Sequence, residues 1–142
     1  MWRWIFAAAL AALLCVLLPP TRAEAGVRVE IDRASQTMDV SIDGAHLYTW
    51  RISTGRAGWP TPPGTFHPQF MAVRWYSRVF NNAPMPHSIF YSGPFAIHGT
   101  TEVSRLGRPA SHGCIRLHPR DAAVLFDLVG HEGMRNTTIV VQ

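Results

Sequence analysis

The sequence feature that most constrains the fold is a strict alternation of apolar and polar residues near the start of the chain. From residue 27 to 32 every second residue is apolar, and the alternation returns over residues 38–42. A period of two places the apolar side chains on one face of a strand, so both segments are predicted as half-buried β-strands. Asp43-Gly44 is then a strong signal for a tight turn, and a third apolar segment follows up to Ile52. The folded part of the chain is therefore predicted to begin as a β-meander.

Glycine and proline are frequent in the middle of the chain, from Thr54 to Pro94, which favours long loops that join short strands. Further on, Pro119 opens a stretch with apolar residues at helical spacing, and Gly130 is the predicted end of that helix. Residues 137–141 are rich in β-branched residues and predict a last strand that packs against the meander. The pattern indicates a mainly β domain with a small helical part.

Six aromatic side chains crowd the middle region, and they have two interpretations. They can line a groove for an extended substrate, or they can fill the core, which is the commoner place for each one taken singly. The six are Trp59, Trp75, Tyr76, Phe80, Phe90 and Tyr91.

The N-terminal segment has the organisation of a secretory signal peptide. Arg3 precedes an apolar run over residues 4–18, and Ala25 closes an A-x-A cleavage site. A retained membrane anchor is disfavoured, because a run of about 15 residues is shorter than the ~20 that a spanning helix needs. We therefore predict a signal peptide over residues 1–25 and one domain over residues 26–142. Cleavage near Ala25 would release that domain to the periplasm or cell envelope.

All 13 basic residues are arginine, and the formal net charge is +4. The arginines are scattered and form no basic stripe interleaved with aromatic residues, so no nucleic-acid partner is expected. A modestly cationic surface suits an anionic polymer such as cell wall, and it is also what ordinary solvated surface charge produces.

One cysteine, Cys114, is present after residue 25, so no disulfide can form within residues 26–142. A thiol becomes a strong nucleophile when an imidazole takes its proton, and it can then attack a carbonyl to form a thioester. Two histidines are candidates for that base. If residues 111–117 are extended, His112 and Cys114 project to the same face, whereas His98 must be brought near by the fold.

Two alternative interpretations give the cysteine and the two histidines other roles than catalysis. His98, His112 and Cys114 are all good zinc ligands, but a closed site needs a fourth ligand, and no C-x-x-C or H-E-x-x-H spacing accompanies them. The other alternative is a non-catalytic wall-binding or structural β-domain in which Cys114 is buried and inert. We expect neither a metal nor an organic cofactor.

The order of these motifs resembles that of the L,D-transpeptidases of the YkuD type. The hallmark of that family is a histidine in an H-G-T context followed by S-H-G-C and a hydrophobic residue, present here at residues 98–100 and 111–115. The Ser-Thr-Gly at residues 53–55 and the T-P-P-G-T-F at residues 61–66 also match. S-H-G-C alone is a moderate signal, but its combination with the upstream H-G-T and the T-P-P-G-T-F is highly specific, and the resemblance covers nearly all of residues 26–142.

The resemblance implies a role for each residue of these motifs. Cys114 becomes the nucleophile that accepts the acyl group, and His98 becomes its base, with the Gly99 carbonyl orienting the imidazole. His112 becomes a supporting residue, and backbone N–H groups around His112, Gly113 and Cys114 form the oxyanion hole.

Arg116 and Ser111 keep two interpretations each. Arg116 can bind a stem-peptide carboxylate through its planar guanidinium, or it can form a structural ion pair with an acid such as Asp121. Ser111 can hydrogen-bond within the site or stabilise the turn.

The resemblance also implies a reaction and a fold. The enzyme would cleave a peptidoglycan tetrapeptide stem at its third residue and transfer the acyl group from Cys114 to an amine of another stem peptide or a lipoprotein lysine. Water as acceptor would make it an L,D-carboxypeptidase. The implied fold is a single β-sandwich-like catalytic domain over residues 26–142 with one or two short helices. We expect it to be a monomer and a target of carbapenems.

Overall fold

The computed structural model describes residues 25–142. The predicted signal peptide lies outside these residues except for Ala25, so it stays a prediction. Within the described residues, no helix is both long enough and apolar enough to cross a membrane.

The described residues form two β-sheets, one α-helix and two short 3₁₀-helices. The elements are β1 (Val27–Asp32), β2 (Thr37–Ile42), β3 (Ala45–Arg51), β4 (Gly64–Phe66), β5 (Phe70–Ala72), β6 (Ser88–Ser92), β7 (Phe95–Gly99), η1 (Val103–Arg105), β8 (Ile115–Leu117), α1 (Pro119–Glu132), η2 (Met134–Asn136) and β9 (Thr137–Val141).

The first sheet has the strand order β3-β2-β1-β9-β4. β1, β2 and β3 form the predicted antiparallel meander. The backbone of Asp43 and Gly44 has positive φ angles of 49° and 82°, as a tight hairpin turn requires. β9 pairs with β1 in parallel, so the last strand packs against the meander as predicted.

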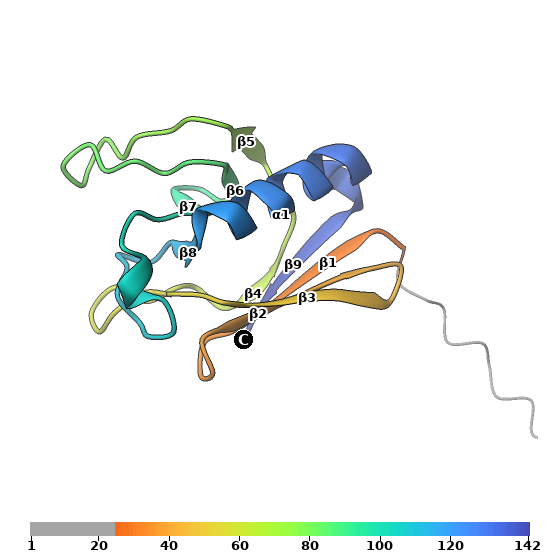
Figure 1. The fold of residues 1–142 in the computed structure, drawn as a ribbon, viewed down its shortest axis with the longest axis horizontal. Helices are drawn as coiled ribbons and strands as arrows, with labels where there is room; N and C mark the ends of the chain where they lie inside the picture. The colour runs from red at the N-terminus through yellow and green to blue at the C-terminus, as the bar shows by residue number, and fades with distance from the viewer. Residues whose placement is uncertain (1–24) are drawn as a thin grey trace, which may run out of the picture.

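The second sheet has the strand order β5-β6-β7-β8, and its last pair, β7 and β8, is parallel. A long segment, residues 73–87, joins β5 to β6 and projects beyond the ends of the sheets (green in Figure 1). Short strands joined by long loops are what the glycine and proline pattern predicts for this region.

The helix α1 contacts β1 of the first sheet and β6, β7 and β8 of the second. It begins at Pro119, as predicted, with His118 as N-cap accepting a hydrogen bond from the Arg120 backbone N–H. The predicted end at Gly130 is wrong, because the helix continues to Glu132. Gly133, with φ +97°, is the residue whose backbone leaves the helical conformation.

The core lies between the two sheets and the helix. Alternating residues of β1 and β2 point into it, together with the apolar stripe of α1. The predicted fold class, a mainly β sandwich-like domain with short helices, is confirmed. The largest fully buried side chains include Tyr91, Ile31, Met38, Ile52, Ile89, Ile97, Ile115, Leu117, Leu125 and Ile139.

Candidate active site

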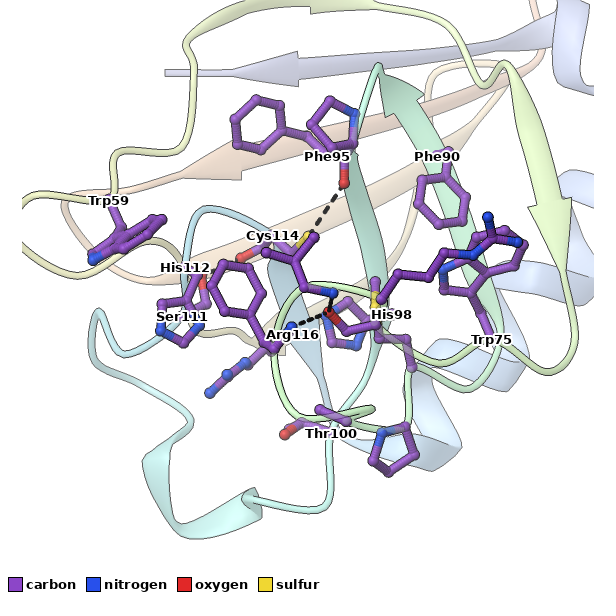
Figure 2. Close-up of a pocket in the computed structure, with 18 of the residues that line it drawn as sticks. Trp59, Trp75, Phe90, Phe95, His98, Thr100, Ser111, His112, Cys114 and Arg116 are labelled. Carbon is purple, nitrogen blue, oxygen red and sulfur yellow. Dashed lines mark hydrogen bonds between the residues drawn. The ribbon is translucent and has the colours of Figure 1, made fainter.

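The parallel pairing of β7 with β8 brings together the two halves of the histidine and cysteine motif. His98 lies opposite Arg116 in the register, and Cys114 comes one residue before β8 begins. Because side chains alternate along a strand, Cys114 and Arg116 share a face with His98. All three line one cavity of about 710 Å³ (Figure 2).

His98 is held by the residue that follows it. Its Nδ1 lies 2.7 Å from the Gly99 carbonyl oxygen. Since a carbonyl can only accept, Nδ1 carries the proton and Nε2 is left with a free lone pair. The pKa of His98 is lowered to about 4, mainly by burial and to a smaller extent by the Arg116 charge, while the Gly99 bond acts in the opposite direction. The imidazole is therefore neutral at neutral pH and can accept a proton at Nε2.

Gly99 is needed for close packing as well as for its carbonyl. A Cβ at this position would lie 3.0 Å from the Pro86 ring and 3.2 Å from the Pro119 Cα at the start of α1. The Gly99 N–H also donates to the Pro86 carbonyl at 2.9 Å. The base is thus anchored where β7, α1 and the 73–87 segment meet.

Cys114 has a free thiol that donates to the Pro94 carbonyl, with 3.8 Å between sulfur and oxygen. Burial raises the pKa of the thiol, while the Ala96 backbone N–H and the Arg116 charge act in the opposite direction. Within residues 25–142, no hydrogen bond joins the sulfur to the His98 ring. The resting pair is therefore a neutral thiol beside a neutral imidazole, and proton transfer must accompany attack on a substrate.

The turn before β8 is not extended, which corrects the basis for proposing His112 as a neighbour of the thiol. Gly113 has φ +115°, and a Cβ there would lie 2.6 Å from the Phe95 ring. The Ser111 hydroxyl donates to the Cys114 carbonyl at 2.5 Å and accepts from the Gly113 N–H at 3.0 Å. Of the two interpretations of Ser111, these bonds support stabilisation of the turn.

Thr61 holds this turn from a distant segment. Its hydroxyl donates to the Gly113 carbonyl at 2.8 Å and accepts from the Gly55 N–H at 2.9 Å. Thr61 is buried, and it begins the T-P-P-G-T-F motif at residues 61–66. The motif therefore contributes a contact to the nucleophile turn, which the sequence did not reveal.

His112 packs between aromatic rings instead of turning toward the sulfur. Its ring stacks on Phe80, with centroids 4.0 Å apart and planes within 4°, and it meets the edge of Trp59 at 5.0 Å. Its pKa is lowered by burial first and then by the Arg56 and Arg116 charges. Among the described residues it has no hydrogen bond to Cys114.

Arg116 forms an ion pair, but not with Asp121. Its guanidinium Nη1 lies 3.0 Å from Oε2 of Glu102, a residue that also lines the cavity. The Arg116 backbone is fixed by two hydrogen bonds to Ser53, at 2.8 and 3.0 Å. The positive charge of Arg116 acts to lower the pKa of both His98 and Cys114. It therefore stabilises a thiolate at Cys114 and destabilises an imidazolium at His98.

Aromatic residues form much of the cavity wall, so the core interpretation is wrong for most of the six. Trp59, Trp75, Phe80 and Phe90 line the cavity, while only Tyr91 belongs to the core. Figure 2 shows Trp59 and Trp75 on opposite sides of Cys114. The site is a broad, mainly apolar cleft in which His98, Cys114 and Arg116 lie among these aromatic residues.

The described residues offer no group of three or more histidine, cysteine, aspartate or glutamate side chains placed to share a metal ion. His98 and His112 are held apart by the Gly99 bond and the Phe80 stack. The zinc alternative therefore has no geometric support in these residues.

Comparison with known proteins matches the chain to one family. The family model of the L,D-transpeptidase catalytic domain, YkuD, matches residues 26–141. The chain is 25% identical over 113 residues to the putative L,D-transpeptidase YkuD of Bacillus subtilis, covering 71% of this chain and 59% of that protein.

Solved structures give the same picture. An L,D-transpeptidase from Mycobacterium smegmatis is 28% identical, with a TM-score of 0.73 over 83% of this chain and 59% of that chain. The transpeptidase LdtMt1, solved in complex with imipenem, is 25% identical, with a TM-score of 0.72 over 82% of this chain and 59% of that chain. The chain thus spans 59% of the length of each of these three relatives.

Proposed function

The chain belongs to the L,D-transpeptidase catalytic domain family, and on that premise we propose that it is a peptidoglycan L,D-transpeptidase with Cys114 as nucleophile and His98 as base. The observation that carries the proposal is the arrangement of His98. Its Nδ1 is bound to the Gly99 carbonyl, and its other nitrogen is free to take a proton in the cavity that also holds the Cys114 thiol.

In the first half-reaction the Cys114 sulfur attacks the carbonyl carbon of the third residue of a tetrapeptide stem. The thiol proton passes to Nε2 of His98 as the sulfur–carbon bond forms. When the carbon–nitrogen bond to the fourth residue breaks, His98 returns the proton to the leaving amine. A thioester on Cys114 and a free amino acid result.

Negative charge develops on the carbonyl oxygen during the attack and needs donors near the sulfur. The Gly113 N–H is already bonded to Ser111, so the backbone N–H groups of His112 and Cys114 are the donors we assign to the oxyanion hole. The Arg116 charge adds to this stabilisation.

In the second half-reaction an amine attacks the thioester carbon, and His98 takes a proton from the amine. The carbon–sulfur bond breaks as the new carbon–nitrogen bond forms, and His98 returns the proton to the Cys114 sulfur. The acceptor is an amine of another stem peptide or a lipoprotein lysine, while water in the same place gives L,D-carboxypeptidase activity. We place the reaction in the periplasm or cell envelope, because residues 1–25 have the pattern of a signal peptide. We propose that a monomer carries it out.

The test uses a carbapenem, whose strained carbonyl should be attacked by the same thiol. Incubation of residues 26–142 with the drug should add the mass of one adduct, located on the peptide that contains Cys114 and absent from Cys114→Ala. EDTA should not change the result. An adduct that persists in Cys114→Ala, or that disappears with EDTA and returns with zinc, would refute the assigned nucleophile.

A further inference from the structure

Glu102 is an acid in the cleft for which the reaction gives no role. It lies three residues after Gly99 in the chain and lines the cavity that holds Cys114 and His98. One of its carboxylate oxygens, Oε2, lies 3.0 Å from Nη1 of Arg116 and 3.5 Å from Nε of Arg105. Glu102 is therefore shared between an arginine inside the cleft and one on the η1 helix.

The two arginines differ in how firmly they are placed. The Arg116 side chain is 17% exposed, and its backbone is bonded in both directions to Ser53. The Arg105 side chain is 49% exposed, and that of Glu102 is 48% exposed. Glu102 is thus the member of the Arg116 pair that can move, and Arg105 offers it a second partner when it does.

The position of Arg116 suits the free carboxylate of an acyl donor. A tetrapeptide cleaved after its third residue has its terminal carboxylate on the residue next to the attacked carbonyl, with consecutive Cα atoms about 3.8 Å apart. The site for that carboxylate must therefore lie beside Cys114. Arg116 is two residues from Cys114 on the same face, about 7 Å along the strand, and a guanidinium is well matched to a carboxylate.

We propose that Glu102 occupies the carboxylate site of the cleft in the free protein and competes with the terminal carboxylate of the acyl donor for Arg116. This inference rests on the proposed function and deepens it. When the donor binds, its carboxylate replaces that of Glu102 on Arg116, and Glu102 keeps its contact with Arg105. Glu102 is then a specificity-determining residue, because its effect is confined to donors that present a free carboxylate.

The test measures binding without turnover. In the Cys114→Ala background, two tetrapeptide stems are titrated, one with a free C-terminal carboxylate and one with a C-terminal amide. Glu102→Gln should bind the free acid about two- to fivefold more tightly, the size expected for a partly exposed ion pair. Its affinity for the amide should stay unchanged. Glu30→Gln removes the same charge from an ion pair with Arg28 on β1 and should alter neither affinity.

Arg105→Gln should change the affinity for the free-acid stem in the opposite direction. Without its second partner, Glu102 should hold Arg116 more firmly, so the free acid should bind more weakly and the amide as before. In the Cys114-containing protein, Glu102→Gln should lower KM for the free-acid donor with little change in kcat.

Equal affinities of Glu102→Gln and its parent for the free acid, or equal changes for acid and amide, would overturn this inference while leaving the proposed function intact. If the Cys114-containing protein neither binds nor cleaves either stem, the proposed function fails and the inference fails with it.

Discussion

The resting state of Cys114 and His98 determines how the nucleophile is activated. Burial raises the pKa of the thiol and lowers that of the imidazole, so both groups are neutral near pH 7. A standing thiolate–imidazolium pair would require the opposite shifts. The thiol should thus be activated during attack, by transfer of its proton to His98. Labelling of Cys114 by a thiol reagent at mildly acidic pH should consequently be slower than labelling of a preformed thiolate.

The low pKa of His98 predicts a loss of stability in acid. Between pH 6.5 and pH 4 the unfolded chain protonates this histidine, whereas the folded protein does not, so the free energy of unfolding falls as the pH falls. The loss from this one group is on the order of 2–3 kcal/mol between pH 7 and pH 4.5. Urea unfolding of the parent and of His98→Gln at both pH values measures it. The variant should lose less stability on acidification, and equal losses would contradict the burial of a neutral imidazole.

The two histidines of the motif should respond differently to substitution. His98→Ala removes the general base and should slow acylation by roughly 100-fold or more. His112→Phe keeps a flat ring against Phe80 and Trp59, so acylation should stay within about threefold of the parent.

Carbapenem acylation rates compare the two variants, with circular dichroism as the control for folding. Equal loss in both would mean that the His112 imidazole takes part in the chemistry.

The residues of the site differed in how well the sequence could predict them. His98 and Cys114 were identifiable because their residue types and flanking motifs indicate the chemistry directly. An ion pair of Arg116 with an acid was one of two interpretations, with Asp121 as the example, but the acid in the structure is Glu102, which lies 14 residues before Arg116 in the sequence and is brought near it by the fold. The ring stack of His112 on Phe80 could not be predicted either, since the two are far apart in the sequence.

At the scale of elements, local pattern predicted strands better than it predicted the helix end. The alternation in β1 and β2 and the Asp43-Gly44 turn are short-range features, and the structure has them where expected. Gly130 looked like a helix end because glycine disfavours helix interiors. Gly130 nevertheless lies within the helix, which continues to Glu132, and the backbone leaves the helical conformation only at Gly133. A Cβ added at Gly130 would meet no atom within 4 Å.

Two glycines, Gly130 within α1 and Gly99 packed against its first residue, should have opposite effects on stability when each is replaced by alanine. Gly130→Ala adds a methyl group in open space within a helix and should raise the free energy of unfolding by about 0.5–1 kcal/mol. Gly99→Ala pushes a methyl group against Pro86 and Pro119 and should lower it by about 1–3 kcal/mol. Denaturant unfolding of both variants checks this, and a stable Gly99→Ala would show that β7 does not need its close approach to α1.

At the scale of the whole molecule, the site is assembled from five separated stretches of chain. Residues 59–61, 69–70, 75–85 and 90–102 meet the nucleophile turn at residues 111–116 around one cavity. Such convergence depends on the order of strands in two sheets, which no short-range pattern encodes. The sequence could therefore predict a mainly β domain, but only the resemblance to a family linked its motifs into one site.

The N-terminal segment should be absent from the exported protein. If residues 1–25 are a signal peptide, the full chain expressed in a bacterium should be recovered outside the cytoplasm with Gly26 as its first residue. Intact mass and N-terminal sequencing of the recovered protein measure this. A product that retains the apolar run and stays with the membrane would support an anchor instead.

The most direct test of the central claim is the mass of the protein during reaction with a tetrapeptide stem. Rapid acid quenching should trap residues 26–142 with the added mass of the tripeptide acyl group on Cys114, together with one equivalent of the released fourth residue. The parent should show both signals, and Cys114→Ala should show neither. Release of the fourth residue by Cys114→Ala, or release by the parent with no acyl group ever found on Cys114, would contradict the account.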